Sequence, residues 1–458
     1  MWPESTPPSA FAARRGRLAA RLESPALFVS GIPRPRNYAA NRFPYRAESH
    51  FLYFVGRPLE GAALLVRPGG ATLYAPLPDP EEALWSGPQA SLESLAQDLQ
   101  IEVRPITELA LSEPTATLPA ADFETALWQG ELTGRDVDPG SGPELQGLDR
   151  TLAEHMIELR LVHDAAAIAQ VRQAGRVTER AHRAGMRATR PGLREAAVVG
   201  AMEAEITGAG CCHAYLPIVT VEGEVLHDER HHREIGAADL VLADVGAETP
   251  EGWASDVTRT WPASGRFSGS QRTLYELVLA TQRAAIAAVK PGVRYRDVHR
   301  LAGKTLLEGL IALGIYRGDL DELYARGAAA LFFPHGVGHL LGLDVHDMED
   351  LGDVAGYAPG RERSKNFGDR YLRLDRDLVE GMLVTIEPGF YRIPRLLERP
   401  EEVGDLEDAL DRTELARYAD VRGIRIEDDV LVTASGADVL TAGIPKEPRE
   451  VEEAVRSA

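Results

Sequence analysis

The chain has 458 residues, of which 44% are hydrophobic and 26% are charged, a globular composition long enough for two or three domains. Its 70 acidic and 50 basic residues give a formal net charge of −20, so we expect no binding to nucleic acid or anionic membranes. No apolar run approaches the ~18 residues that span a bilayer, and the N-terminal segment lacks the apolar core of a secretory signal. The two cysteines, Cys211 and Cys212, are adjacent and unsuited to a disulfide, which favours a cytoplasmic location.

The first 150 residues alternate short strand-like runs with helix-like segments, the pattern of a small α/β domain. Helices are expected at residues 9–22 and 92–99, and strands at residues 26–29 and 62–66. A stretch rich in Gly, Pro and Asp at residues 130–147 is predicted to be a linker. We therefore place one domain at residues 1–150 and a second at residues 151–458.

The second half combines long helices with buried strands. Helices are predicted at residues 165–188, 193–208, 271–290 and 298–313, and strands at residues 241–245, 382–387 and 423–433. Two acidic, irregular stretches at residues 348–377 and 394–420 are interpreted as insertions on this core. The residues that can carry chemistry all lie in this half.

Two acids interrupt apolar strands. Asp244 lies in residues 240–246 (LVLADVG), and Asp256 follows twelve residues later in a Thr- and Val-rich run. A tight turn near residues 250–252 would bring the two side chains together. Either acid alone is more often a turn or cap residue. Two adjacent buried carboxylates, however, repel each other and require a cation or a shared proton.

Three histidines lie within twelve residues, interleaved with glycine and apolar positions: His335, His339 and His346. The first two have the spacing of the zinc-protease motif HExxH. Gly336 stands where that motif has its catalytic glutamate, which excludes this class of protease.

Two glutamates follow apolar strands and complete a set of metal ligands. Glu387 ends the apolar run of residues 383–386, and Glu427 follows an alternating run that places it on one face with Arg425. The full set provides four carboxylates and one imidazole: Asp244, Asp256, His339, Glu387 and Glu427. These are enough ligands for two divalent ions, and oxygen ligands favour Mn²⁺, with Co²⁺ or Zn²⁺ as alternatives. Two such ions can polarise a carbonyl and activate water, which suits hydrolysis of a peptide bond.

Taken together, these motifs resemble those of the pita-bread metallopeptidases, and most closely the proline-specific branch of aminopeptidase P and prolidase. That family has its metal ligands in motifs of the form D-x-G, S-D-x-T-R, H-G-x-G-H-x-x-G-x-x-V-H, E-P-G and R-x-E-D, and each is intact at the five residues above. The resemblance covers residues 164–443. It implies an α+β pita-bread (creatinase-like) catalytic domain after the α/β N-terminal domain, two divalent metal ions, and hydrolysis of the bond between an N-terminal residue and a following proline.

The resemblance also implies roles for residues around the ligands. Glu387 resembles the acid that handles the proton of the attacking water. His335 and His346 resemble histidines that support the site and contact the substrate carbonyl. His227 resembles the histidine that helps to hold the substrate and the developing oxyanion. Arg425 resembles the arginine beside the last ligand, which either binds substrate or pairs with a ligand carboxylate.

Two further segments bear on the subtype. Residues 42–56 (RFPYRAESHFLYFVG) resemble the aminopeptidase P N-terminal domain, of which long prolidases share a version. This implies a homodimer or homotetramer in which the domain lends a wall to a neighbouring active site. The insertion that contains Arg373 resembles long prolidases, where an arginine at this position can hold the free carboxylate of a dipeptide. We expect an Xaa-Pro aminopeptidase acting on proline-containing peptides, with Xaa-Pro dipeptidase (prolidase) as the alternative.

Three other members of the fold remain as alternatives. A non-catalytic pita-bread binding protein, and the metal-free creatine amidinohydrolase, lack metal ligands that are all present here. A methionine aminopeptidase would share the ligands, but residues 42–56 and His227 disfavour it. A metal analysis of the purified protein separates the catalytic interpretation from the binding one.

Overall fold

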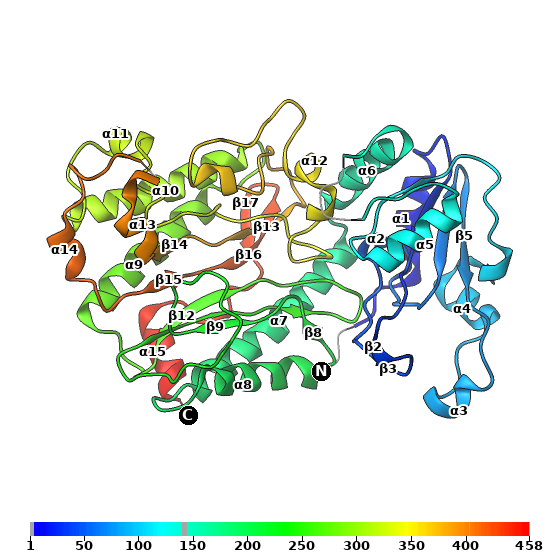
Figure 1. Ribbon diagram of the computed structural model, residues 1–458, viewed down its shortest axis with the longest axis horizontal. Helices are drawn as coiled ribbons and strands as arrows, with labels where there is room; N and C mark the ends of the chain where they lie inside the picture. Colours follow the sequence, from blue (N-terminus) through cyan, green and yellow to red (C-terminus); the bar gives the residue numbers. More distant parts are fainter. Residues whose placement is uncertain (1–3, 140–143, 403, 458) are drawn as a thin grey trace.

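The computed structural model describes residues 4–139, 144–402 and 404–457. The chain forms two lobes that lie side by side (Figure 1). The N-terminal lobe, blue and cyan in the figure, is built around one sheet, and the larger lobe holds the rest of the chain. This arrangement matches the predicted combination of an α/β N-terminal domain with a larger catalytic domain.

The N-terminal lobe contains a five-stranded mixed sheet in the order β6-β5-β4-β1-β7. Its strands are β1 (Ala26–Val29), β4 (Ala63–Arg67), β5 (Gly70–Ala75), β6 (Glu102–Pro105) and β7 (Ala116–Thr117). The accompanying elements are α1 (Pro8–Ala19), the hairpin strands β2 (Pro35–Tyr38) and β3 (Asn41–Arg42), α2 (Ser49–Val55), α3 (Glu82–Ser86), α4 (Leu92–Leu99), η1 (Ile106–Glu108) and α5 (Phe123–Thr133). The predicted helices at residues 9–22 and 92–99 and strands at residues 26–29 and 62–66 are confirmed within three residues at each end.

The connection between the lobes is more helical than expected. Residues 130–133 of the predicted linker belong to α5, and residues 140–143 lie outside the described residues. Helix α6 (Gly147–Arg160) follows, with Leu152 and Met156 buried on one face. It packs on α1 and β7 of the N-terminal lobe. The division into residues 1–150 and 151–458, which we retain as a proposal, therefore falls within a helix.

The larger lobe places helices around small antiparallel sheets (Figure 1). Its long helices are α7 (Ala165–Ala188), α8 (Glu195–Gly208), α9 (Gly269–Ala288), α10 (Tyr295–Ala312) and α15 (Pro448–Arg456). Helix α7 pairs with α8, and α9 pairs with α10. Asp164 caps α7 by accepting a hydrogen bond from the Ala167 amide, and Ser268 and Gln271 form a capping box at the start of α9. The four helices predicted in this half are confirmed within three residues at each end.

The strands of the larger lobe belong to four small sheets. They are β8 (Cys212–His213) with β11 (Ala247–Glu248); β9 (Ile218–Thr220), β10 (Leu240–Asp244) and β12 (Thr258–Pro262); β13 (Leu383–Ile386), β16 (Asp428–Thr433) and β17 (Gly436–Val439); and β14 (Gly389–Tyr391) with β15 (Gly423–Arg425). The described residues of the predicted insertions form short helices: η2 (Glu349–Leu351), α12 (Asp353–Gly356), η3 (Asp369–Tyr371), α13 (Pro394–Glu398), η4 (Pro400–Glu402) and α14 (Arg412–Ala416). A further short helix, α11 (Leu320–Ala325), precedes them.

The single strand predicted at residues 423–433 is wrong. The strand ends at Arg425 and a new strand begins at Asp428. The reason is that β15 pairs with β14, whereas β16 pairs with β13 and β17. Residues 423–432 are all buried, so the hydrophobic pattern gives no sign that the chain changes sheets. The break matters for the site, since Glu427 lies in it.

The lobes share a common apolar interior. Buried side chains from α1 through α15 form one continuous cluster, and a smaller cluster covers the other face of the N-terminal sheet. Both cysteines are free, as their adjacency predicts. Among the helices that the structure describes, none combines the length and apolar character needed to cross a membrane.

Candidate metal centre and active site

The two predicted aspartates meet at one end of a sheet. Asp244 is the last residue of β10 and pairs in register with Thr258, the first residue of β12. The chain between these strands makes a tight turn in which the Gly252 amide donates to the Thr249 carbonyl (2.8 Å). Asp256 lies two residues before β12, so the turn returns it to the side of Asp244, as the sequence predicts.

The imidazole of His339 has one nitrogen free for a metal ion. Its Nδ1 donates to the Leu340 carbonyl (2.8 Å), which leaves Nε2 directed toward Asp256 Oδ2 (3.3 Å) and Glu387 Oε1 (3.7 Å). Thr385 fixes the backbone, since its hydroxyl accepts from the His339 amide (3.1 Å) and its own amide donates to the His339 carbonyl (3.0 Å). A hydrogen bond on the remote nitrogen is the usual support for a metal-binding histidine.

Glu427 lies between two overlapping groups of ligands. Its amide donates to the Thr258 carbonyl (3.0 Å) and its Oε2 accepts from the Thr258 hydroxyl (2.7 Å). Each group offers three ligand atoms that all lie within 4.8 Å of one another: Asp244, Asp256 and Glu427 in the first, and His339, Glu387 and Glu427 in the second. Because Glu427 belongs to both, the arrangement suits two ions with a shared carboxylate.

The side chains in this site do not titrate normally. Burial, followed by the charges of Asp256 and Glu387, raises the pKa of Glu427 well above its ordinary value. Burial also raises the pKa of Asp244 to about 6 and that of Glu387 to about 7. Burial alone would lower the pKa of His339, but its hydrogen bond to Asp256 and the charge of Asp256 outweigh burial and raise the pKa to about 9. Asp244, Glu387, Glu427 and His339 therefore hold their protons to unusually high pH unless cations replace them, whereas the pKa of Asp256 is lowered because its contacts with His339 outweigh its burial.

The predicted ligands fit a pair of divalent ions. Asp256 Oδ1 is buried and has no hydrogen-bond partner among the described residues, which is costly for a carboxylate oxygen that binds nothing. The other donors are carboxylate oxygens and one free imidazole nitrogen, a set that Mn²⁺, Co²⁺ and Zn²⁺ all accept. Bound cations would satisfy the orphaned oxygen and relieve the repulsion among the acids.

Arg425 and His335 are linked through a tyrosine. Arg425 donates to Asp244 Oδ2 (2.6 Å), to the Thr258 hydroxyl (2.8 Å) and to the Tyr391 hydroxyl (3.1 Å). The Tyr391 hydroxyl donates to His335 Nε2 (2.9 Å), while Nδ1 of His335 donates to its neighbouring carbonyl (2.8 Å). Burial lowers the pKa of His335 to about 3, so this imidazole is neutral. The guanidinium of Arg425 is thus paired with a predicted ligand carboxylate.

Three residues beside the ligands had not been predicted. The Tyr215 hydroxyl donates to Asp244 Oδ1 (2.6 Å). Asp429 accepts from the Asp256 amide (3.0 Å) and from the Ser255 hydroxyl (2.7 Å). Glu349 lies between two predicted residues, with Oε2 3.4 Å from His346 Nδ1 and 2.5 Å from Arg373. Two consecutive acids in the apolar β16 are a sequence signal for Asp429, whereas no pattern marks Tyr215 or Glu349.

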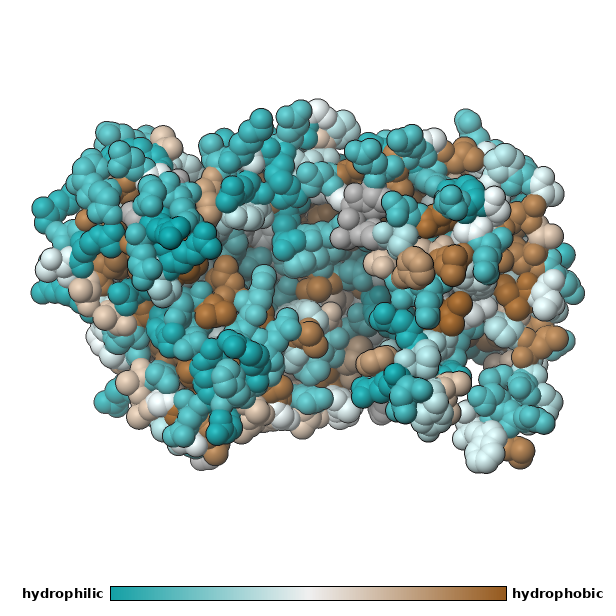
Figure 2. All heavy atoms as spheres, in the orientation of Figure 1, coloured by the Kyte–Doolittle hydropathy of each residue, from teal (hydrophilic) through white to brown (hydrophobic). Residues whose placement is uncertain are grey.

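A cavity of about 570 Å³ brings the predicted residues together. Its lining includes every predicted ligand and every predicted catalytic or substrate-binding residue: His227, Asp244, Asp256, His335, His339, His346, Arg373, Glu387, Arg425 and Glu427. The residues that line the cavity all belong to the larger lobe, and the space-filling view shows a hollow near the middle of the molecule (Figure 2). The cavity is large enough for a short peptide, and histidines and arginines surround the ligands.

Comparison with known sequences decides the family. Residues 169–434 match the sequence model of metallopeptidase family M24, and residues 11–116 match that of the aminopeptidase P N-terminal domain. The chain belongs to metallopeptidase family M24. The matched segment of this M24 peptidase contains all five predicted ligands, and family membership confirms the pita-bread fold and the expectation of a metal-dependent peptidase.

Relatives of this M24 peptidase span nearly its whole length. A probable Xaa-Pro aminopeptidase PEPP from Fusarium vanettenii is 34% identical over 90% of this chain and 87% of its own. The Xaa-Pro dipeptidase of Homo sapiens is 33% identical over 97% of this chain and 93% of its own. The solved structure of aminopeptidase PepP from Pseudomonas aeruginosa superposes with a TM-score of 0.80 at 31% identity, covering 99% of each chain.

Metal binding by this M24 peptidase should release protons and weaken at low pH. Asp244 and Glu387, with pKa values raised to about 6 and about 7, take up protons as the pH falls, so protons compete with the ions. We expect close to two divalent ions per chain at about pH 7.5, and affinity at least about tenfold weaker at about pH 5.5. Titration calorimetry with Mn²⁺ and elemental analysis measure both. A folded chain that binds no ion, or an affinity independent of pH, would contradict the assignment.

Proposed function

We propose that this protein is an Xaa-Pro aminopeptidase, which hydrolyses the bond between an N-terminal residue and a following proline in tripeptides and longer peptides. The proposal rests on one observation. Two overlapping ligand groups that share Glu427 line the same cavity as the predicted substrate histidines. Membership of metallopeptidase family M24, and relatives named Xaa-Pro aminopeptidase and Xaa-Pro dipeptidase, support the reaction class.

We propose that the ligands are the five residues Asp244, Asp256, His339, Glu387 and Glu427, and that the ions are Mn²⁺, with Co²⁺ or Zn²⁺ as alternatives. The ions, when bound, supply Lewis acidity and lower the pKa of water at the site. Tyr215 and Arg425 hold Asp244 in place, and Asp429 holds the backbone of Asp256. These supports fix the ligands before substrate arrives.

In the proposed reaction the protein supplies proton transfer and stabilises charge on the substrate. The Glu387 carboxylate accepts the proton of the attacking water and passes it to the proline nitrogen that leaves. His227 and His346, which line the cavity, donate hydrogen bonds to substrate oxygen as negative charge develops on it. His335 stays neutral and supports Tyr391 and Arg425 behind the ligands.

The pairing of Arg373 favours aminopeptidase over dipeptidase action. In a dipeptidase a free arginine would hold the carboxylate of the terminal proline. Here Arg373 is 42% exposed and already pairs with Glu349 at 2.5 Å, so its charge is compensated without a substrate carboxylate. A longer peptide has no carboxylate beside its proline. When such a peptide binds, Arg373 would still be paired with Glu349. The likeness to human Xaa-Pro dipeptidase keeps dipeptidase action as the second candidate.

Assays of wild type and Arg373→Ala on Ala-Pro and Ala-Pro-Ala test this proposal. We expect wild type to cleave the tripeptide at least as efficiently as the dipeptide. Arg373→Ala should retain kcat/KM for the tripeptide within about threefold, since the proline of the tripeptide carries no free carboxylate. Arg370→Ala is a matched control, because Arg370 lies in the same insertion and contacts Tyr371 instead of Glu349. A wild type that prefers Ala-Pro, with about a tenfold or greater loss on that substrate alone in Arg373→Ala, would make the enzyme a dipeptidase.

We also propose a cytoplasmic homodimer or homotetramer. Exposed apolar side chains on α3 support self-association, since Leu84 is 81% exposed and Trp85 is 85% exposed. The free thiols of Cys211 and Cys212 suit a reducing compartment. The net charge of −20 argues against nucleic acid and anionic membranes as partners, which leaves proline-containing peptides.

A further inference from the structure

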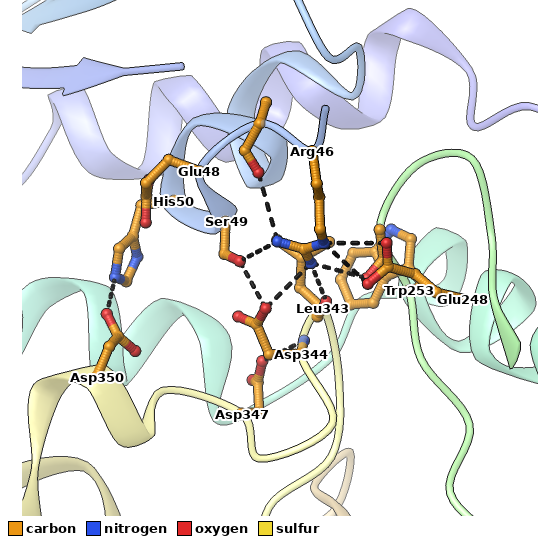
Figure 3. A network of polar contacts seen from close by, with 12 residues as sticks. Arg46, Glu48, Ser49, His50, Glu248, Trp253, Leu343, Asp344, Asp347 and Asp350 are labelled. Atoms are coloured by element: carbon orange, nitrogen blue, oxygen red, sulfur yellow. Dashed lines mark hydrogen bonds and ion pairs between the residues drawn. The ribbon is translucent and has the colours of Figure 1, made fainter. Parts of the chain in front are cut away.

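The polar segment at the start of α2 has no part in the proposed reaction, yet it faces the larger lobe (Figure 3). Arg46, Glu48, Ser49 and His50 belong to the segment of residues 42–56 that resembles the aminopeptidase P N-terminal domain. Figure 3 shows these side chains reaching from the N-terminal lobe toward a loop of the larger lobe that carries Asp344, Asp347 and Asp350.

Arg46 connects two segments of the larger lobe with Ser49, the first residue of α2. Its Nε donates to both carboxylate oxygens of Glu248 (3.0 and 2.9 Å), and one terminal nitrogen donates to the Leu343 carbonyl (3.0 Å) and to Asp344 Oδ1 (3.0 Å). The other terminal nitrogen donates to the Ser49 hydroxyl (2.8 Å), which itself donates to Asp344 Oδ1 (2.6 Å). The fork of an arginine side chain makes such multiple contacts with fixed geometry.

A second arginine holds the far side of the same loop. Arg160, the last residue of α6, is 1% exposed and donates to Asp344 Oδ2 (3.1 Å) and Asp347 Oδ1 (2.6 Å). It also donates to His50 Nδ1 (3.1 Å), and His50 Nε2 in turn donates to Asp350 Oδ2 (3.0 Å). Every acid of the loop from Asp344 to Asp350, apart from Glu349, is therefore bonded to this network of residues from the first 160 positions.

The loop residues that bond to Arg46 and Arg160 lie on both sides of His346 in the sequence. Asp344 lies two residues before it and Asp347 directly follows it. The loop is closed on itself, since the Asp344 amide donates to Asp347 Oδ1 (3.0 Å) and the Asp347 amide donates to the Leu340 carbonyl (3.1 Å). It is also tightly packed, because a Cβ at Gly342 would lie 2.7 Å from His163. Because the loop is held this closely, the loss of any of these hydrogen bonds would shift the loop and with it the imidazole of His346.

The network is not itself a metal site. Glu48, His50 and Asp350 do offer ligand atoms within 4.8 Å of one another. Both nitrogens of His50 are, however, already hydrogen-bonded within the protein, to Arg160 and Asp350. The Arg160 guanidinium supplies the positive charge that a metal ion would otherwise bring.

We propose that Arg46, with Ser49 and His50, positions the loop of residues 343–350 from the N-terminal lobe of the same chain and so sets the place of His346 over the substrate carbonyl. The inference rests on the proposed function, in which His346 contacts that carbonyl. Arg46 is a positioning residue, since the contacts described run through Asp344 and Leu343 and reach neither the ligands nor the substrate histidines directly.

Arg46→Ala tests the proposal through kcat. A displacement of a catalytic group by about 1 Å can lower the rate about 10²-fold, and we expect a smaller displacement here. In Arg46→Ala, kcat on Ala-Pro-Ala should be about tenfold lower, KM should change less than about threefold, and the metal content should be unchanged. Arg46→Lys, which keeps one charge but loses the fork, should give an intermediate kcat. Arg42→Ala is the matched control: Arg42 lies in the same segment and pairs with Glu60 inside the N-terminal lobe, so kcat should stay at the wild-type value.

A second variant addresses folding. Arg46→Ala leaves the nearly buried Glu248 carboxylate without its partner, which can destabilise the chain. Asp344→Asn keeps the shape of the loop and removes the carboxylate charge that pairs with Arg46 and Arg160, and it should also lower kcat. If both residues act through one loop, the double variant should lower kcat little more than either single change.

The outcomes separate this inference from the proposed function. Reduced melting temperature with wild-type kcat in Arg46→Ala and Asp344→Asn would overturn the inference and make the network a structural contact between lobes. A strictly multiplicative effect of the two changes would overturn it as well. A metal-loaded wild type that cleaves neither Ala-Pro nor Ala-Pro-Ala would overturn the proposed function, and this inference with it.

Discussion

Replacing Glu427 with alanine should abolish turnover while the protein stays folded. Glu427 offers a ligand atom to both groups, so its loss weakens both ions together. Removal of one hydrogen-bond donor from an active site costs about 10²–10³-fold, and loss of the ions removes both Lewis acidity and activated water, so we expect kcat to fall by more than about 10³-fold. Asp256→Ala should behave in the same way, since Asp256 has an orphaned oxygen aimed at no protein donor among the described residues.

The fold should survive because the substitution relieves repulsion among buried acids. Burial and the neighbouring carboxylates raise the pKa of Glu427, which means that its ionised form is unfavourable without cations. Circular dichroism and thermal unfolding check the fold, and elemental analysis checks the metal. Glu380→Ala, at an exposed position before β13, is the control and should keep full activity. Near-normal kcat in Glu427→Ala with Mn²⁺ supplied would refute the ligand assignment.

His227→Ala and His346→Ala should lower kcat by about 10²–10³-fold with the metal content intact. Both side chains line the cavity, and the loss of a donor to a developing oxyanion has this magnitude. KM should change far less than kcat, because the interaction strengthens as charge develops on the substrate. Steady-state kinetics on Ala-Pro-Ala, with metal analysis of each variant, measures the effect. His232→Ala removes an exposed histidine outside the cavity and should leave kcat unchanged.

The same pair of variants can reveal a different role for His346. Its ligand atom lies within 4.8 Å of those of Asp256 and His339, and its ring centroid is 4.2 Å from that of His339. If metal content falls in step with kcat in His346→Ala but not in His227→Ala, then His346 supports the ions and not the substrate. Constant metal content with reduced kcat would support the role proposed here.

The sequence by itself determined the main helices and the set of proposed metal ligands. Long helices have a regular apolar period and end signals such as the capping box at Ser268 and Gln271, which act over a few residues. Asp244 and Asp256 could be selected because a carboxylate inside an apolar strand is costly unless something compensates its charge. The apolar residues on either side of each aspartate in the sequence therefore indicate that its carboxylate is buried. The family resemblance then ordered the five motifs into one site.

Only the tertiary structure decided how these pieces are held. The break between β15 and β16 depends on which strand each one pairs with, and a run of uniformly buried residues contains no mark of that choice. Tyr215, Glu349 and the Arg46 network act on partners far away in the chain, with Arg46 and Asp344 298 positions apart. A hydrogen bond between distant residues leaves no periodicity in either local segment. Sequence patterns therefore selected the proposed ligands but not the supports that position them.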